Sequence, residues 1–409
     1  MANEQYKDQK KPLKFSKKKI NNAARDIRHG AQNHERLEAI DKIQNFREFH
    51  LYPLMLMKNH LVRTAKRVSP KVVVARRLKR LPTIIDKLER PTLDGQNQNA
   101  IKLTRMQDIA GCRAIVKDKT ELALLRDKLE RSRCVHRIVR TKDYLSSPKS
   151  SGYGGLHLIY SCYEGQDEQH DWKGASVEVQ LRTKLQHSWA TSLEIIDTLE
   201  GINLKTSVSG HDKWRRFFEV SGQLVAHKED LHRLENSEYF NLLAELNSLS
   251  HELDPIGKLS RYSLAINISS MSSIPQSKRS GKGLFLISMP LHKGDDEQEE
   301  YSVTVDFFPR NESDQAIEGL NKAELNPDIL MCVLVSAEGV RNLKQAYPNY
   351  FGSTKLFSGF LTSQTQAYNK YLKLKVKLAI QMVEEKKASG EELPQKLVEH
   401  IEQVKGLIG

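Results

Sequence analysis

The sequence has few cysteines and no long apolar run, and both shortages narrow the class of protein. Its four cysteines are scattered and form no Cys-x-x-Cys pair: Cys112, Cys134, Cys162 and Cys332. This spacing argues against a zinc ribbon and against a disulfide framework. No apolar stretch is long enough to span a bilayer, and the start "MANEQYKDQKKPLKF" lacks the apolar core of a signal peptide. We therefore expect a cytoplasmic protein that uses neither a membrane nor zinc.

Positive charge is abundant and unevenly placed. The formal net charge is +13, and residues 1–30 alone carry seven lysines and two arginines against three acids. A second basic cluster, "KRVSPKVVVARRLKRL", occupies residues 66–81. Such clusters neutralise phosphates and are typical of proteins with a polyanionic partner. A solvated basic surface is the plain alternative, and charge alone does not choose between RNA and a nucleotide.

The pattern along the chain predicts an α+β fold. Residues 16–68 have helical apolar spacing, with Ser16 as a helix N-cap and an interruption at Pro53. Between about 101 and 199 strands alternate with helices: "AGCRAIV", "TELALLRDKLERSR", "HRIVRT", "LHLIYSCY", "ASVEVQLRT" and "KLQHSWATSLEIIDTL". Helices continue to about 253, and a break at "DPIGKLS" precedes alternating runs such as "GLFLISM" and "ILMCVLVSA". A charged amphipathic helix is expected near the C-terminus.

Two groups in the first half have residue types that suit phosphate and metal chemistry. In "RLKRLPTIIDK", Arg77, Lys79 and Lys87 stand around a predicted helix start, where side chains and free N–H groups can hold a triphosphate. In "MQDIAGCR", Asp108 is a suitable oxygen ligand for Mg²⁺ and Arg113 can take up phosphate charge. Each group alone is equally well explained by a surface ion pair or a capping residue.

A strand and a loop add a second set of polar residues. In "VEVQLRT", alternation puts Glu178, Gln180 and Arg182 on one face of a strand. If Glu178 meets Asp108 across adjacent strands, the two form the carboxylate pair of metal-assisted phosphoryl transfer. The loop "DYLSSPKSSGYGGLHLIY" places Tyr153, as an exposed ring, among glycines. Such a ring suits base stacking, and packing of the ring on the core is the alternative.

Four sequence blocks, taken in order, resemble the RelA/SpoT synthetase domain over about residues 70–200. They are R-x-K-x-x-x-T-x-x-x-K, D-x-x-G-x-R, Y-x-x-x-P-K-x-x-G-Y-x-x-L-H and E-V-Q-x-R-T. That family has a nucleotidyltransferase-like mixed β-sheet with flanking helices, and it moves the β,γ-pyrophosphate of ATP to a ribose 3′-hydroxyl. The resemblance implies an ATP site of Arg77, Lys79, Thr83, Lys87 and Arg113, a catalytic Mg²⁺ site of Asp108 and Glu178, and an acceptor pocket of Lys149, Tyr153, His157 and Gln180.

Two acceptors are known in this family, GDP or GTP and the 3′-CCA end of tRNA. A tRNA presents phosphates well beyond the active site, and the basic N-terminus suits it, with Lys17, Lys18 and Lys19 as contacts. We expect the tRNA acceptor. The alternatives are a (p)ppGpp synthetase with a regulatory tail and an inactive RNA-binding regulator.

The C-terminal part resembles fused toxin–antitoxin members of the CapRel type, through Tyr347 and Tyr350 in "AYPNYF". The resemblance implies a smaller β-rich, zinc-finger-like domain without metal ligands, followed by a C-terminal helix. In that type the two tyrosines occupy the adenine site until a phage protein, with a capsid protein as the candidate, is sensed. The expected divisions are a basic helical region at 1–69, the pyrophosphokinase core at 70–253, a hinge at 254–262 and an antitoxin or sensor domain at 263–409.

Overall fold

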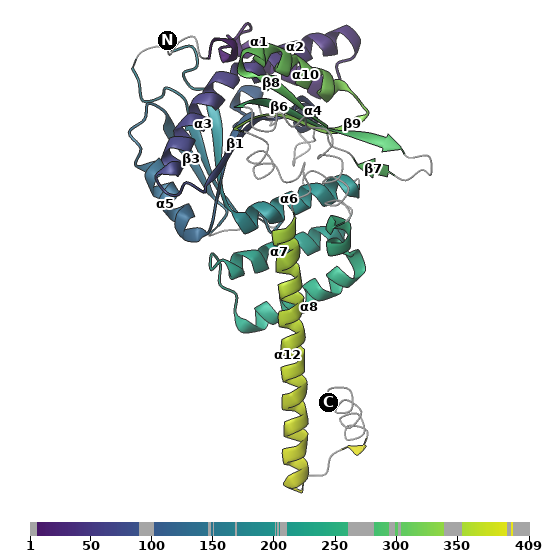
Figure 1. Cartoon of the computed structure of the whole chain (residues 1–409). Coiled ribbons are helices and arrows are strands. Elements are labelled where there is room, and N and C mark those ends of the chain that lie inside the picture. Colours follow the sequence, from purple (N-terminus) through teal and green to yellow (C-terminus); the bar gives the residue numbers. More distant parts are fainter. Residues whose placement is uncertain are drawn as a thin grey trace.

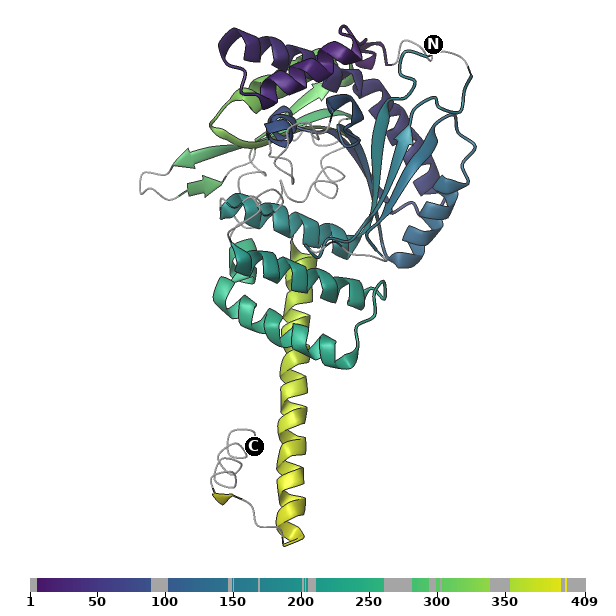
Figure 2. The ribbon, with the colours of Figure 1, turned by 180° about the vertical axis from the view of Figure 1, so that it is seen from behind.

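The structure is a computed structural model of the whole chain, shown in Figures 1 and 2. It describes residues 6–89, 102–145, 149, 151–167, 170–200, 202, 204, 211–260, 282–293, 299–301, 304–338, 354–390 and 394–395. Among the helices of these ranges, none combines the length and the apolar character that a membrane span needs.

The N-terminal region is helical, as expected. A short 3-10 turn, η1 (Lys7–Gln9), precedes three helices: α1 (Lys17–Arg28), α2 (Asn33–Phe49) and α3 (Leu51–Lys66). Ser16 caps α1, because its side chain accepts a hydrogen bond from the backbone N–H of Lys19 at 3.3 Å. Pro53 lies in the first turn of α3, where a missing N–H costs no helical hydrogen bond. Both local signals in the sequence are confirmed.

The centre of the molecule is a five-stranded mixed sheet. Its strands are β1 (Val73–Leu78), β2 (Ala110–Val116), β3 (Arg137–Asp143), β4 (Leu156–Ser161) and β5 (Ser176–Thr183). The spatial order is β1-β2-β5-β4-β3, with β2 parallel to β5 and the other pairs antiparallel. The expected α+β fold with a mixed sheet is confirmed. Strand β1 was not predicted, since its arginines had marked it only as part of a basic cluster.

Helices cover both faces of this sheet. On one face α3 packs on β1 and β2, and α5 (Lys119–Glu130) packs on β2, β5 and α3. The apolar face of β5, including Val177, Val179 and Leu181, is fully buried there. The other face carries polar side chains and receives α6 (Lys184–Leu199), beyond which lie α7 (Asp212–Lys228) and α8 (Asn236–Leu253) (Figure 2). Two shorter elements flank this second face, α4 (Leu81–Glu89) and the 3-10 turn η3 (Leu103–Arg105).

The C-terminal half forms a second, antiparallel sheet with one helix. It comprises β6 (Lys282–Lys293), β7 (Glu299–Tyr301), β8 (Thr304–Pro309), the 3-10 turn η5 (Arg310–Glu312), α10 (Ser313–Leu325) and β9 (Ile329–Glu338). Strand β6 pairs with all three other strands. We call the described residues between 282 and 338 the C-terminal unit. It packs on the N-terminal half of the chain, with β9 against β1 and with α10 against η1 and α2 (Figure 1).

The C-terminal half was expected to have a zinc-finger-like domain and, before it, a hinge. No group of three potential ligands among the described His, Cys, Asp and Glu side chains could hold a metal ion, and the zinc-finger-like character stays a prediction. The segment expected as a hinge is helical over 255–260, where Leu259 is fully buried and Lys258 pairs with Glu200 at 2.5 Å. This part of the segment is therefore anchored to the N-terminal half of the chain, through the residue that follows α6.

The last described element is a long helix, α12 (Lys355–Ala388). Its first turns bury Phe357, Phe360 and Leu361 against α6, α7 and α8, and the rest extends away from the body of the molecule (Figures 1 and 2). The expected C-terminal helix is therefore present, and its base lies in the core formed with α6, α7 and α8. Tyr347 and Tyr350 lie outside the described residues.

Candidate functional site

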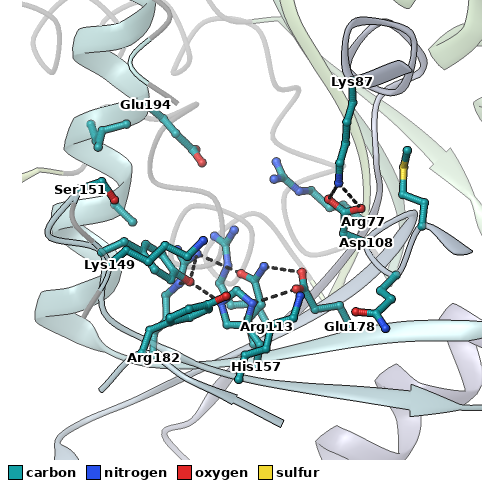
Figure 3. A pocket seen from close by; sticks show the side chains of 18 of the residues that line it. Arg77, Lys87, Asp108, Arg113, Lys149, Ser151, His157, Glu178, Arg182 and Glu194 are labelled. Atoms are coloured by element: carbon teal, nitrogen blue, oxygen red, sulfur yellow. Dashed lines mark hydrogen bonds and ion pairs between the residues drawn. The ribbon is translucent and has the colours of Figure 1, made fainter. Parts of the chain in front are cut away.

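The polar face of the central sheet forms the floor of a large cavity of about 1100 Å³. Its walls come from α6 on one side and from α4 with the turn before β2 on the other (Figure 3). Among the residues that the structure describes, nine cationic side chains line it: Arg77, Lys87, Lys102, Arg105, Arg113, Arg140, Lys142, Lys149 and Arg182. The acidic residues of its described lining are Asp108, Glu178 and Glu194. A cavity above the usual range for one small ligand, and so rich in cations, suits more than one phosphorylated group.

Asp108 lies between two lysines on the α4 wall. Its carboxylate is 3.0 Å from Lys79 Nζ and 3.1 Å from Lys87 Nζ, as the dashed lines to Lys87 show in Figure 3. Burial alone would raise the pKa of Asp108, but the two ammonium groups outweigh it and lower that pKa to about 2. The carboxylate is therefore ionised at neutral pH. Lys87 and Asp108 are 21 residues apart in the sequence and meet only in the folded chain.

Glu178 lies on the floor, on the strand next to the one that Asp108 precedes. Gly111 pairs with Glu178 in the parallel β2–β5 ladder, and Arg77 pairs with Gly111 across β1 and β2. This register brings Asp108 and Glu178 into the same cavity, as the sequence pattern predicted. Two carboxylates fit a magnesium ion whose remaining ligands are phosphate oxygens and water, which is how proteins usually hold Mg²⁺ beside nucleotides.

Glu178 also belongs to a hydrogen-bonded chain that crosses the floor. His157 Nδ1 is 2.8 Å from Glu178 Oε1, and His157 Nε2 is 2.6 Å from the hydroxyl of Tyr153. Arg182 donates to the same hydroxyl through Nε at 3.2 Å and Nη2 at 2.9 Å. Gln180 completes the chain by donating to Glu178 Oε2 at 2.7 Å. The alternation expected for β5 is confirmed, because Glu178, Gln180 and Arg182 share this face.

The protonation of this chain follows from its surroundings. Burial lowers the pKa of His157, against the opposing effect of Glu178, so the ring is neutral at pH 7. Burial disfavours the carboxylate of Glu178, but hydrogen bonds from His157 and Gln180 reverse this and lower its pKa. An ionised Glu178 accepts from His157 Nδ1–H, which leaves Nε2 to accept from the hydroxyl of Tyr153. The imidazole thus links the carboxylate to the phenol in one defined tautomer.

The ring of Tyr153 is half-buried, whereas the sequence suggested an exposed ring. It meets the ring of Tyr144 edge-on at 5.8 Å, and the guanidinium of Arg182 lies 5.0 Å from its centre. Lys149 lies over both tyrosine rings, 4.5 Å from the centre of Tyr144 and 5.3 Å from that of Tyr153. The physical reason is the turn of the loop, which folds the tyrosine back over the strand so that its hydroxyl can reach His157.

The remaining predicted residues are spread more widely. Arg113 and Arg77 line the cavity, and Arg113 Nη1 is 3.5 Å from His187 Nδ1. Thr83 is half-buried on α4 and is not part of the cavity lining. One detail of the helix start differs from expectation, because the N–H of Leu81 at the beginning of α4 donates to Glu324 of the C-terminal unit at 3.2 Å.

The lysines at 17–19 begin helix α1 and are exposed. Helix α1 packs on η3, where Asn21 Oδ1 accepts from both the N–H and the hydroxyl of Thr104 at 3.1 Å. Lys102 and Arg105, on either side of Thr104, belong to the cavity lining. The basic start of α1 is therefore joined to the cavity wall by a direct contact.

Sequence reasoning missed several members of the lining. Arg182 stood on the correct face of its strand but was not singled out. Tyr144, whose ring contacts Lys149, could have been predicted only from its place at the start of the third sequence block. Lys102, Arg105, Arg140 and Lys142 were missed because they follow no shared motif and meet only in the folded chain.

Part of the chain matches a described family. Residues 76–195 match the model described as a region found in RelA / SpoT proteins. GTP pyrophosphokinase YjbM of Bacillus subtilis (strain 168) is 30% identical over 125 residues, which are 30% of this chain and 54% of that protein. GTP pyrophosphokinase YwaC of the same strain is 30% identical over 115 residues, 28% of this chain and 52% of that protein. These matches support the RelA/SpoT synthetase family for this region, while the CapRel branch stays a prediction.

The chain spans about half the length of these curated relatives. Among solved structures, small alarmone synthetase 1 from Bacillus subtilis bound to its product pppGpp is similar with a TM-score of 0.36 and 19% identity, over 44% of this chain and 88% of that chain.

Proposed function

We propose that this protein is an ATP-dependent pyrophosphokinase that transfers the β,γ-pyrophosphate of ATP to the 3′-hydroxyl of the tRNA CCA end and so blocks translation. The observation that carries the proposal is the cavity in which Asp108 and Glu178 lie among nine cationic side chains. Phosphoryl transfer needs positioning and charge compensation more than covalent chemistry, and this lining offers both. The match of residues 76–195 to the RelA/SpoT region agrees with it.

The α4 wall is the proposed ATP side. Arg77, Lys79, Lys87 and Arg113 would bind the phosphates, and Asp108 with Glu178 would hold Mg²⁺. A bound Mg²⁺ would compensate the charge that develops on the transferred group. Asp108 now pairs with two lysines, so the arrival of the ion and of the triphosphate would exchange these lysine contacts for phosphate contacts.

The β3–β4 side is the proposed acceptor side. Lys149 and Tyr153 would receive the terminal nucleoside, with the tyrosine ring as its stacking partner. Glu178, an ionised carboxylate on the cavity floor, would accept the proton of the attacking hydroxyl. His157 and Gln180 keep its oxygens oriented through hydrogen bonds of 2.8 and 2.7 Å.

Two further parts of the proposal rest on the sequence. The exposed lysines at 17–19 would contact tRNA phosphates, which is supported by the contact between α1 and the cavity wall. Tyr347 and Tyr350 would silence the enzyme by entering the adenine site until a phage protein is bound, because the segment that contains them resembles the neutralising motif of fused toxins. A tethered blocker is effective because its local concentration is high.

A second candidate is a (p)ppGpp synthetase, and the names of YjbM and YwaC as GTP pyrophosphokinases favour it. The third reading, an inactive RNA-binding regulator, is disfavoured because both carboxylates are retained in the cavity. Incubation with γ-labelled ATP, Mg²⁺ and either tRNA or GDP separates the three. Label on tRNA supports the proposal, and label on the guanine nucleotide supports the second candidate. No label on either, also from a variant with Tyr347→Ala and Tyr350→Ala in which the proposed block is removed, refutes both.

A further inference from the structure

The C-terminal unit makes a buried ionic contact with helix α2 in the N-terminal half of the chain. Arg47 of α2 and Glu324 of α10 pair through Nη2 and Oε1 at 2.9 Å, and each side chain is only 1% exposed. Asn321, one turn earlier on α10, accepts a hydrogen bond from Gln44 at 3.0 Å. A buried ion pair persists only when its remaining donors and acceptors are also satisfied, so the other contacts of this pair are informative.

Those other contacts go to the backbone of the proposed ATP site. Arg47 Nε donates to the carbonyl oxygen of Lys79 at 2.8 Å, and Glu324 Oε2 accepts from the N–H of Leu81 at 3.2 Å. The pair therefore holds the first residue of the two-residue link that joins β1 to α4, and also the first residue of α4 itself. The side chain of Lys79 extends from this link to Asp108, and α4 carries Lys87 to the same carboxylate.

We propose that Glu324 is a positioning residue for ATP binding, through which the C-terminal unit sets the placement of Lys79 and Lys87. Its carboxylate acts on the link between β1 and α4 and on Arg47, and it touches no substrate. Loss of the charge would leave Arg47 buried without its partner and would free the start of α4 to shift. The inference rests on the proposed role of the two lysines in binding ATP.

The contact also gives the C-terminal unit a physical route to the active site. Glu324 is 243 residues from Leu81 in sequence, yet it binds the first N–H of the helix that carries Lys87. Any event that moves α10 would withdraw this acceptor. In the docked arrangement the C-terminal unit therefore supports the ATP site.

The test uses the full chain with Glu324→Gln, which keeps the side-chain shape and removes the charge. Asp314→Asn is the matched control, because Asp314 lies on the same helix and pairs with Lys11 of the N-terminal region at 2.7 Å without touching the ATP site. Direct titration with ATP and Mg²⁺, the KM values for ATP and for the acceptor, and thermal unfolding are measured for each. Glu324→Asp, which keeps the charge on a shorter stem, is the second variant.

We expect Glu324→Gln to weaken ATP binding about tenfold, because the loss of one hydrogen bond to a charged group has an effect of about this size. The KM for the acceptor and the behaviour of Asp314→Asn should match the wild type, and Glu324→Asp should recover part of the affinity. Unchanged ATP binding in folded Glu324→Gln overturns the inference. Equal weakening toward ATP and acceptor, or a lower melting temperature with unchanged KM values, also overturns it by showing a purely structural role.

If Glu324→Gln does not fold, the Asp variant decides alone, with weakened ATP binding at unchanged acceptor KM as the supporting result and wild-type binding as the opposing one. Failure of the proposed function is recognised separately. In that case neither the wild-type protein nor a variant with Tyr347→Ala and Tyr350→Ala, in which the proposed block of the adenine site is removed, binds ATP in the titration. That result removes the basis of the inference.

Discussion

Replacement of Glu178 by glutamine tests the proposed chemistry at its central group. The carboxylate accepts hydrogen bonds from His157 and Gln180 at 2.8 and 2.7 Å. Glutamine keeps one acceptor oxygen and turns its amide group toward one of these donors, so one of the two bonds is lost. Hydrogen bonds to charged groups contribute about 1.5–3 kcal/mol, and we expect the free energy of unfolding to fall by about 2 kcal/mol.

The substitution should also lower the rate of pyrophosphate transfer, and this effect is separate from the loss of stability. Removing a group that compensates or accepts charge in the transition state typically lowers rates about 100-fold or more. That factor corresponds to about 2.7 kcal/mol in the activation free energy. The variant should therefore remain folded under assay conditions while transferring label from γ-labelled ATP at no more than about 1% of the wild-type rate.

The assay measures the initial rate of labelling with saturating ATP, Mg²⁺ and the preferred acceptor, alongside thermal unfolding. The reference protein and the Glu178 variant both carry Tyr347→Ala and Tyr350→Ala, so that the proposed block of the adenine site does not silence the reference. Glu164→Gln is the matched control, because Glu164 accepts a single hydrogen bond from Ser161 at 2.8 Å and is exposed away from the cavity. Asp108→Asn should behave like the Glu178 variant. A folded Glu178→Gln protein that labels its acceptor at nearly the wild-type rate would refute the assignment of this cavity as the active site.

Three more predictions address RNA contact, autoinhibition and pH. Charge reversal of the lysines at 17–19 should weaken action on tRNA and leave ATP binding unchanged. The slope of log tRNA affinity against log salt concentration should become shallower by about 0.9 or less for each lost phosphate contact. Equal slopes for the variant and the wild type would contradict this prediction. Alanine at both Tyr347 and Tyr350 should make the enzyme toxic to cells, and toxicity should vanish when Glu178→Gln is added; a harmless or insoluble double variant would indicate structural tyrosines instead. Burial raises the pKa of Glu229 from 4.5 to about 7 against a hydrogen bond from Thr183. Because the unfolded chain loses this proton at a lower pH than the folded chain, the free energy of unfolding should fall as the pH rises from about 4.5 to 7. In denaturant titrations, Glu229→Gln should remove up to about 3 kcal/mol of that fall. Parallel curves of stability against pH for the two proteins would refute the assignment.

Local sequence patterns were sufficient to predict the central strands of the sheet and the side chains of β5 that form the cavity floor. The run "AGCRAIV" became β2 because its strand is buried between neighbours, and strict alternation in β5 put Glu178 on the cavity face. Helix α6 begins and ends where its apolar spacing does. These features follow from side-chain periodicity, which is independent of the rest of the chain.

The unpredicted features depend on contacts between distant segments. Strand β1 carries adjacent arginines and becomes a strand only through antiparallel pairing with β2. The half-burial of Tyr153 depends on His157 and Arg182, which are its partners only after the loop closes. No periodicity in α10 could indicate that Glu324 would bind the start of α4.

The central claim is that the acceptor is the 3′ end of tRNA. The most direct measurement incubates purified tRNA with ATP, Mg²⁺ and the protein carrying Tyr347→Ala and Tyr350→Ala, in which the proposed block of the adenine site is removed. The RNA is then digested, and the mass of its terminal adenosine is measured by mass spectrometry. The account predicts a terminal adenosine that has gained one pyrophosphate group, and no gain when the terminal 3′-hydroxyl is replaced by hydrogen. An unmodified terminal adenosine, in a reaction that pyrophosphorylates added GDP or GTP, would contradict it.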